Sequence, residues 1–190
     1  MCWGVMMPRK NAKGKWNLKM SPDEWYWKVD PHEIKDSLEE QNKRDIIGSM
    51  IDMGRVLDIG CGEGHLINHV YNENYYYGID VSLLAIARAK RMYGSGFFWV
   101  QDISNERLDN KYKYIILSEV LYYIKPDRWY IVSENIKAAL ENDGRFIVSV
   151  GQYFTENDIM NIFPWCKFDK VFKLPSNKYE YNLIMSGRKK

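Results

Sequence analysis

Three glycines at alternate positions follow an apolar segment and an acidic residue. They lie in the stretch Asp58-Ile59-Gly60-Cys61-Gly62-Glu63-Gly64. Glycines at this spacing let the backbone turn sharply and approach a ligand closely, and a helix that starts behind such a loop favours nucleotide-like groups. The stretch predicts a cofactor-binding loop, with Asp58, Gly60, Cys61 and Gly62 as candidate contacts.

The spacing of these glycines argues against a dinucleotide cofactor. A nicotinamide-binding loop reads Gly-x-Gly-x-x-Gly. If Gly60 and Gly62 are its first two glycines, the third place falls on His65. The observed pattern is instead Asp-x-Gly-x-Gly-x-Gly, in which the acid stands two residues before the first glycine.

Acidic residues also end the next two predicted strands. Asp80 stands about 20 residues after Gly60, where an acid is well placed to accept hydrogen bonds from ribose hydroxyls. Asp102 closes the following strand. Each acid alone has a simpler interpretation, because Asp58 and Asp80 could be strand-end or helix-cap residues and Asp102 a turn residue. Their joint order and spacing favour a cofactor site.

Ser118 and Glu119 end a fourth predicted strand, which is continuously apolar. Open α/β sheets place their ligands at the rim formed by the carboxyl ends of the strands. Ser118 is therefore a further candidate cofactor contact.

Strand and helix patterns alternate along the chain. The predicted strands span residues 55–59, 75–79, 97–101, 112–118, 145–150, 168–174 and 179–185. The predicted helices span residues 37–51, 64–71, 82–93, 126–141 and 155–163, and Ser82 is expected to cap the third of them. The alternation predicts an α/β fold with a Rossmann-like, doubly wound, mostly parallel sheet of seven strands. The last two strands, joined at Pro175-Ser176-Asn177, predict a C-terminal antiparallel hairpin.

The size and composition of the chain fit one domain. With 190 residues, 46% of them hydrophobic, we expect a single domain over residues 21–190, with a helical cover at 21–52, a core at 53–190 and a flexible tail at 1–20. A net charge of +2 is too small to imply nucleic acid or a membrane surface as a partner. Three widely spaced cysteines form no disulfide framework, which favours a reducing cytoplasm.

The glycine loop and the strand-end acids resemble those of class I S-adenosylmethionine-dependent methyltransferases, over residues 53–186. This resemblance implies S-adenosyl-L-methionine as the cofactor, with the glycine loop against its methionine part. It also implies that Asp80 contacts the ribose, that Asp102 takes the adenine amino group and that Ile103 packs on the ring, with Val81 as a further candidate cofactor contact.

A narrower resemblance concerns Ser118-Glu119-Val120-Leu121-Tyr122-Tyr123, which is similar to the signature of the nodulation protein S (NodS) methyltransferases. Asp30-Pro31 and residues 37–44 are similar to an upstream stretch of that family, with His32 in place of its tryptophan. The resemblance implies N-methylation of a small-molecule amine such as an amino sugar. O- or S-methylation, a nucleic-acid methyltransferase and a non-catalytic cofactor-binding module are the alternatives.

An amine must be neutral when it attacks a methyl group, so a carboxylate that holds the amine and helps its proton leave is useful chemistry. Glu119 is the catalytic candidate. Tyr122 or Tyr123 would line the path of the methyl group, and we predict that Tyr122 is the one that does. The alternatives are that Glu119 only contacts the cofactor or caps the next turn, and that the tyrosines pack beneath the following helix.

Three other features have weaker functional interpretations. Residues 25–27 (Trp-Tyr-Trp) would suit a lid over the cofactor. Lys43 or Arg44 would pair with the cofactor carboxylate, or else lie on a solvated helix face. His65 and His69 have the spacing of two metal ligands, but the sequence offers no obvious third ligand, so we expect no metal.

Overall fold

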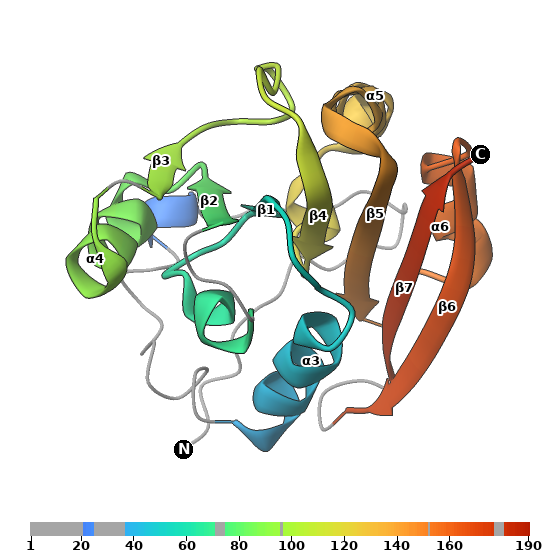
Figure 1. The fold of residues 1–190 in the computed structure, drawn as a ribbon, viewed down its shortest axis with the longest axis horizontal. Helices are drawn as coiled ribbons and strands as arrows, with labels where there is room; N and C mark the ends of the chain where they lie inside the picture. The colour runs from blue at the N-terminus through green and yellow to red at the C-terminus, as the bar shows by residue number, and fades with distance from the viewer. Residues whose placement is uncertain (1–20, 25–36, 71–74, 96, 152, 177–180) are drawn as a thin grey trace.

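Seven strands form one sheet in the order β3-β2-β1-β4-β5-β7-β6 (Figure 1). The structure is a computed structural model that describes residues 21–24, 37–70, 75–95, 97–151, 153–176 and 181–190. The predicted tail at 1–20 and the aromatic residues 25–27 lie outside the described residues. The boundaries expected at residues 20/21 and 52/53 stay predictions.

The strands run mostly parallel, as predicted. They are β1 (Val56–Ile59), β2 (Tyr76–Asp80), β3 (Phe98–Val100), β4 (Tyr112–Ser118), β5 (Leu140–Gly151), β6 (Cys166–Pro175) and β7 (Tyr181–Lys189). The first five pair in parallel, and β7 pairs antiparallel with both β5 and β6. The predicted fold class is confirmed, including the terminal hairpin, whose β7 lies inside the sheet and β6 at its edge (Figure 1).

In the described ranges, longer helices and 3-10 turns connect or cover the strands. The helices are α3 (Leu38–Gly48), α4 (Leu83–Tyr93), α5 (Trp129–Ala139) and α6 (Glu156–Ile162), and the turns are η1 (His65–His69), η3 (Leu121–Tyr123) and η4 (Pro126–Arg128). Ser82 caps α4 as predicted, because its hydroxyl accepts from the Ala85 amide at 3.1 Å. None of the helices in the described ranges has the length and apolarity that crossing a bilayer requires.

The helix predicted at 64–71 is wrong in type, since these residues form the shorter turn η1. Gly64 precedes it in the left-handed conformation, and Val70 after it is already extended. The turn also packs tightly against α3. A Cβ at Gly48 would lie 2.1 Å from the His69 carbonyl oxygen, so the two backbones are in direct contact.

The helix predicted at 126–141 ends earlier than expected, at Ala139. Leu140 is fully buried and extended, and it pairs with Tyr112 as the first residue of β5. The pairing resumes at Tyr114 and Arg145, so residues 141–144 form an irregularity in the strand rather than a helix end. Burial of the Leu140 side chain in the core therefore overrides the turn signal of Asn142-Asp143-Gly144.

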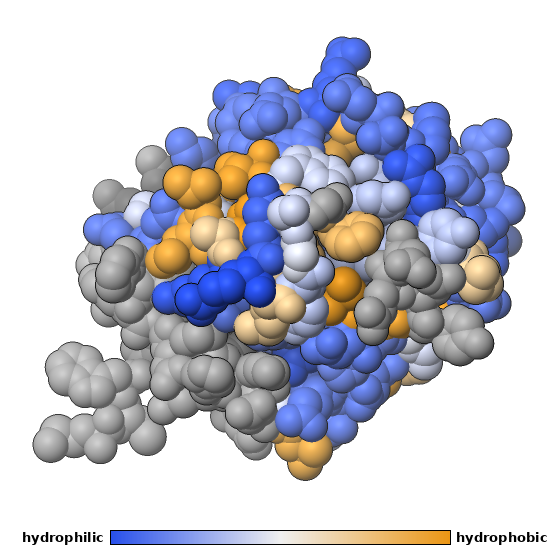
Figure 2. Space-filling view, turned by 60° about the vertical axis from the view of Figure 1, so that its left-hand side comes forward, coloured by the Kyte–Doolittle hydropathy of each residue, from blue (hydrophilic) through white to orange (hydrophobic). Residues whose placement is uncertain are grey.

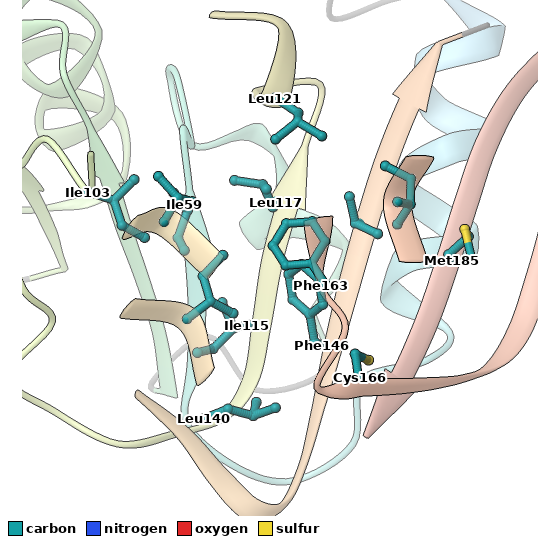
Figure 3. Close-up of a cluster of buried hydrophobic side chains, with 14 of the residues drawn as sticks. Ile59, Ile103, Ile115, Leu117, Leu121, Leu140, Phe146, Phe163, Cys166 and Met185 are labelled. Atoms are coloured by element: carbon teal, nitrogen blue, oxygen red, sulfur yellow. The ribbon is translucent and has the colours of Figure 1, made fainter. Parts of the chain in front are cut away.

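The sheet is buried on both faces by two apolar clusters. Along β4, Ile115 and Leu117 face one cluster, whereas Tyr114 and Ile116 face the other, as the two-residue period of a strand requires. Figure 3 shows the first cluster, in which the rings of Phe146 and Phe163 lie with centroids 4.7 Å apart. Residues of α5 and α6 belong to the first cluster, and residues of α3, η1 and α4 to the second.

Helices on both faces leave the carboxyl ends of β1, β2, β4 and β5 at one rim of the sheet. The helix α3, which precedes the first strand in the chain, also lies near this rim. Its Glu39 Oε1 accepts from Ser176 Oγ at 2.6 Å and from Asn182 Nδ2 at 2.7 Å, which fastens α3 to the hairpin.

Candidate active site

The glycine loop after β1 has the backbone conformation that its sequence predicts. Gly60, Gly62 and Gly64 have φ angles of 72°, 57° and 80°, in the left-handed region that favours glycine. A Cβ at Gly60 would also lie 2.2 Å from Val120 Cγ2. The loop after β1 therefore touches the segment after β4, and only a residue without a side chain fits at position 60.

Asp80 holds the glycine loop from the end of β2. Its Oδ2 accepts from the Gly62 amide at 2.9 Å, and its Oδ1 accepts from the Ser82 amide at 2.8 Å. Burial raises the pKa of Asp80, although these amide hydrogen bonds oppose the shift. The Asp80 carboxylate thus lies beside the glycine loop, as predicted, and also caps the start of the segment that leads into α4. Its contact with a ribose stays a prediction.

Asp58 and Cys61 lie beneath the loop. Asp58 is 4% exposed and accepts from Tyr76 Oη at 2.5 Å, and burial raises the pKa of this carboxyl to about 7. The Cys61 thiol is buried, and burial raises its pKa well above the ordinary value, as do Asp58 and Asp80. A thiol of this kind is not a nucleophile. Both side chains therefore support the loop from inside.

Asp102 and Ile103 follow β3 as predicted, but their side chains turn toward the protein. Asp102 Oδ1 accepts from the Ser104 amide at 2.9 Å, and its Oδ2 accepts from Asn105 Nδ2 at 2.6 Å. Partial burial alone would raise the pKa of Asp102, but the hydrogen bonds from Ser104 and Asn105 lower it overall. Ile103 is 4% exposed in the apolar core. The turn role of Asp102 is present, and the adenine contacts stay predictions.

The rim near β2 and β3 carries exposed apolar side chains. Val81, Leu83 and Val100 are 48%, 66% and 45% exposed. Figure 2, in which the side of β3 and α4 comes forward, shows hydrophobic residues gathered on this face with hydrophilic residues around them. Val81 therefore offers a flat cofactor ring more apolar surface than the buried Ile103 does.

Glu119 has an unusual backbone conformation at the end of β4. Among the non-glycine residues that the structure describes, it alone has a positive φ, of 59°. Its Oε1 accepts from Ser149 Oγ at 2.9 Å, and its amide donates to the Ser149 carbonyl at 2.9 Å. Its Oε2 accepts from Tyr122 Oη. Such conformations cost about 1–3 kcal/mol and persist where the surrounding structure enforces them, often at functional sites.

Lys43 joins this cluster from α3. Its side chain is 3% exposed, and its Nζ lies 2.8 Å from Glu40 Oε1 and 3.4 Å from Glu119 Oε1. Burial lowers the pKa of Lys43, but the carboxylates of Glu119 and Glu40 raise it by more, so the amine is charged. The interpretation of Lys43 as part of a solvated helix face is therefore wrong.

The two tyrosines after Glu119 differ in role. Tyr122 is 2% exposed, and its hydroxyl accepts from the Gly151 amide at 2.6 Å while it donates to Glu119. Tyr123 is 41% exposed. Partial burial raises the pKa of Tyr123 to about 12, helped by Glu119 and Asp80. Tyr122, the tyrosine predicted to act in catalysis, thus holds Glu119 from the buried side, and Tyr123 is the exposed member of the pair.

The structure brings several residues to the site that the sequence did not single out. Ser149 is the register partner of Ser118, and strand pairing alone would have found it. Asp23 belongs to a short helical turn at the start of the predicted cover, and its Oδ1 accepts from Ser82 Oγ at 2.5 Å. No sequence signal connects residues so far apart.

The two histidines of η1 bind different acids. His69 Nδ1 lies 2.7 Å from Asp45 Oδ1, and His65 Nε2 lies 3.6 Å from Glu63 Oε2. Within the described residues, no group of three or more His, Cys, Asp or Glu side chains is placed to hold a metal ion.

Comparisons with known proteins agree with this geometry. Residues 14–177 match the methyltransferase domain family. Nodulation protein S of Azorhizobium caulinodans is 38% identical over 100 residues, which are 50% of this chain and 48% of that protein. Putative methyltransferase 235L of Invertebrate iridescent virus 6 is 38% identical over 64 residues, which are 32% of this chain and 24% of that protein. The matches thus span about half or less of these curated relatives.

Solved structures share the fold. NodS from Bradyrhizobium japonicum WM9, an N-methyltransferase, has a TM-score of 0.69 at 18% identity and covers 82% of this chain and 98% of its own. A TehB-like SAM-dependent methyltransferase from Corynebacterium glutamicum has a TM-score of 0.68 at 21% identity and covers 78% and 87%. Magnesium protoporphyrin IX methyltransferase from Synechocystis, with bound SAM, has a TM-score of 0.67 at 19% identity and covers 86% of each chain.

The similarity to these solved structures shows the fold. The match to the methyltransferase domain family covers most of the chain. The resemblance to the NodS proteins, inferred from residues 118–123, is confirmed by the identity to nodulation protein S. The chain belongs to the methyltransferase domain family.

Proposed function

We propose that this protein transfers a methyl group from S-adenosyl-L-methionine to the nitrogen of a small-molecule amine, such as an amino sugar. The family match supports the methyl-transfer chemistry. The single observation that carries the choice of acceptor is Glu119, a carboxylate held in a strained backbone conformation at the rim and 23% exposed.

The rim fits the proposed cofactor. The loop from Gly60 to Gly62 allows close approach of a ligand to the backbone, and the buried acid Asp80 stands beside it. Val81 supplies exposed apolar surface at the same edge. In this proposal the loop contacts the methionine part, Asp80 the ribose, and Val81, Asp102 and Ile103 the adenine side. When bound, the cofactor supplies a methyl group on a positively charged sulfur.

The protein contributes position more than chemistry. The lone pair of the neutral nitrogen forms the new N–C bond, and the C–S bond breaks with its electron pair on sulfur. The proton that leaves the nitrogen passes by way of the Glu119 carboxylate to solvent. Holding two reactants in line lowers such a barrier by about 7–11 kcal/mol. Glu119 accepts a hydrogen bond from the amine and orients it, and Tyr123 lines the approach from the solvent side.

Transfer of an isotope-labelled methyl group tests this proposal. The acceptors are a matched set with an amine, a hydroxyl or a thiol on the same small scaffold, together with RNA and DNA. We expect label on the amine, and we expect Glu119→Gln to lower kcat/KM for the amine by about 10²–10⁴-fold, the usual contribution of a general acid–base group. Label on the hydroxyl, the thiol or the nucleic acid and none on any amine would reject the proposed acceptor.

A further inference from the structure

One aspartate fastens the N-terminal part of the chain to the start of α4. Asp23 lies in a short helical turn at residues 22–24. Its Oδ1 accepts from Ser82 Oγ at 2.5 Å and from the Leu84 amide at 3.3 Å, donors that are 59 and 61 residues away in the sequence. A carboxylate at the first turn of a helix is also favoured by the helix dipole. Asp23 therefore caps α4 from a distant segment.

The turn that carries Asp23 has a capping arrangement of its own. Ser21 Oγ accepts from the Glu24 amide at 3.2 Å, and the Ser21 amide donates to Glu24 Oε2 at 2.8 Å. This reciprocal pair is a capping box, which fixes the start of a helical turn. A turn of three residues is not stable in isolation in water. Its position therefore depends on contacts such as those of Asp23 with α4.

Ser82 connects the Asp23 contact to the glycine loop. The side chain of Ser82 is fully buried, and its hydroxyl accepts from the Ala85 amide at 3.1 Å. The backbone amide of Ser82 donates to Asp80 Oδ1, and Asp80 Oδ2 accepts from the Gly62 amide. A serine hydroxyl has one proton to donate, and Asp23 accepts it. With Asp23 in place, the Ser82 hydroxyl is not available to compete with a ligand for Asp80.

A second contact joins α4 to the glycine loop one turn and a half further along the helix. Arg88 Nη1 lies 2.7 Å from Oε1 of Glu63, a loop residue whose side chain is 6% exposed. At the start of the helix, Asp80 bridges Ser82 and Gly62. The loop and α4 are thus held together at two places. A segment that is fastened to the start of α4 is therefore also fastened to the loop.

We infer that Asp23 is a positioning residue that couples docking of the N-terminal turn to cofactor binding at the glycine loop. The docked turn holds the Ser82 hydroxyl away from Asp80, which then keeps Gly62 in place and meets the cofactor. By linkage, docking raises the affinity for the cofactor, and the cofactor strengthens docking by the same factor. The inference rests on the cofactor contacts of the proposed function and is independent of the acceptor.

Isothermal titration calorimetry of the full chain with S-adenosylhomocysteine tests the coupling. Asp23→Asn keeps an accepting oxygen without the charge, and Asp23→Ala removes both. We expect Asp23→Ala to weaken binding by about 5–20-fold, at the lower end of the usual coupling between sites because Asp23 is exposed. Asp23→Asn should lose less, and Asp23→Ala should have a smaller effect in a Ser82→Ala background. Asp127→Ala is the matched control, because it removes an exposed acid close to the start of α5.

Hydrogen exchange of the Glu24 amide, measured by NMR, separates this coupling from a purely structural cap on α4. We expect S-adenosylhomocysteine to slow this exchange in the original protein, by a factor comparable to the loss of affinity in Asp23→Ala, and to have no effect on it in Asp23→Ala. A purely structural cap predicts no response of Glu24 to the ligand in either protein.

Two results would overturn the inference while the original protein still binds S-adenosylhomocysteine. One is an exchange rate of the Glu24 amide that the ligand does not change. The other is equal affinity of Asp23→Ala and the original protein. If the original protein does not bind S-adenosylhomocysteine at all, the cofactor contacts of the proposed function fail as well, so the two failures are distinguishable.

Discussion

The backbone amide of Gly62 donates to Asp80 Oδ2 at 2.9 Å, which joins the glycine loop after β1 to the last residue of β2. The same carboxylate accepts from the Ser82 amide at the start of α4. Asp80 therefore sets the shape of the loop before any ligand arrives. This preorganisation lowers the cost of ordering the loop on binding.

Replacing Asp80 by Asn should weaken cofactor binding. The amide keeps the shape of the side chain but can accept at only one of the two positions, so either Gly62 or Ser82 loses its acceptor. An unsatisfied buried donor costs about 1–3 kcal/mol, and we expect S-adenosylhomocysteine affinity to fall by a comparable factor of about 5–150. Isothermal titration calorimetry measures this, with the exposed Asp127→Asn as control. Equal affinities of the two variants would contradict the role of Asp80.

Replacing Gly60 by Ala should destabilise the fold through a clash as well as through the backbone. The new Cβ would meet Val120 Cγ2 at 2.2 Å, at a φ of 72°. Gly94 has φ 100° and ψ 159° with open space around its Cβ position, so Gly94→Ala reports the cost of a glycine-only backbone conformation without a clash, about 1–3 kcal/mol. We expect urea unfolding to show a larger loss for Gly60→Ala, partly restored by Val120→Ala. A loss no larger than that of Gly94→Ala would disprove the clash.

Asp58 should make stability depend on pH. Burial raises its pKa in the folded protein to about 7 from an ordinary 3.8, so the folded state binds more protons than the unfolded state between these values. The contribution of Asp58 is then fully present below about pH 4 and is lost as pH rises to about 7. We expect the free energy of unfolding, relative to Asp58→Asn, to fall across this window. A relative stability that rises or stays constant would contradict the raised pKa.

The two tyrosines after Glu119 should separate stability from catalysis. Tyr122→Phe leaves the buried Gly151 amide without its acceptor, so we expect a loss of about 1–3 kcal/mol in unfolding free energy together with lower kcat. Tyr123→Phe changes a half-exposed side chain, so we expect unchanged stability and lower kcat/KM. Urea titrations and steady-state kinetics on both variants decide this. The reverse pattern would mean that Tyr122 faces the acceptor.

Local sequence signals predicted the parts of the site that depend on local geometry. The glycine spacing fixed the loop from Gly60 to Gly64, and apolar runs placed Asp80 and Ser118 at strand ends. These features depend on backbone conformation and on the two-residue period of strands, which nearby residues determine. For the same reason the hairpin was predicted, with strands at 168–174 and 179–185 where the structure has β6 and β7.

The sequence did not predict the relationships that arise from packing. The end of α5 was missed because burial of Leu140 outweighs the turn residues after it. The contact between Lys43 and Glu119 depends on how α3 docks against the sheet. Helix periodicity alone could not distinguish a buried Lys43 from one on a solvated helix face. The positive φ of Glu119 is enforced by its neighbours Ser149 and Tyr122, which lie on separate elements.

The most direct test of the central claim is the position of the methyl group on an acceptor that offers both nitrogen and oxygen. Glucosamine has one amine and several hydroxyl groups on one ring, so tandem mass spectrometry of its product locates the transfer. We predict methyl on nitrogen, with the yield strongly reduced in Glu119→Gln. Methyl on oxygen, with a yield that Glu119→Gln leaves unchanged, would contradict an amine-directed site at Glu119.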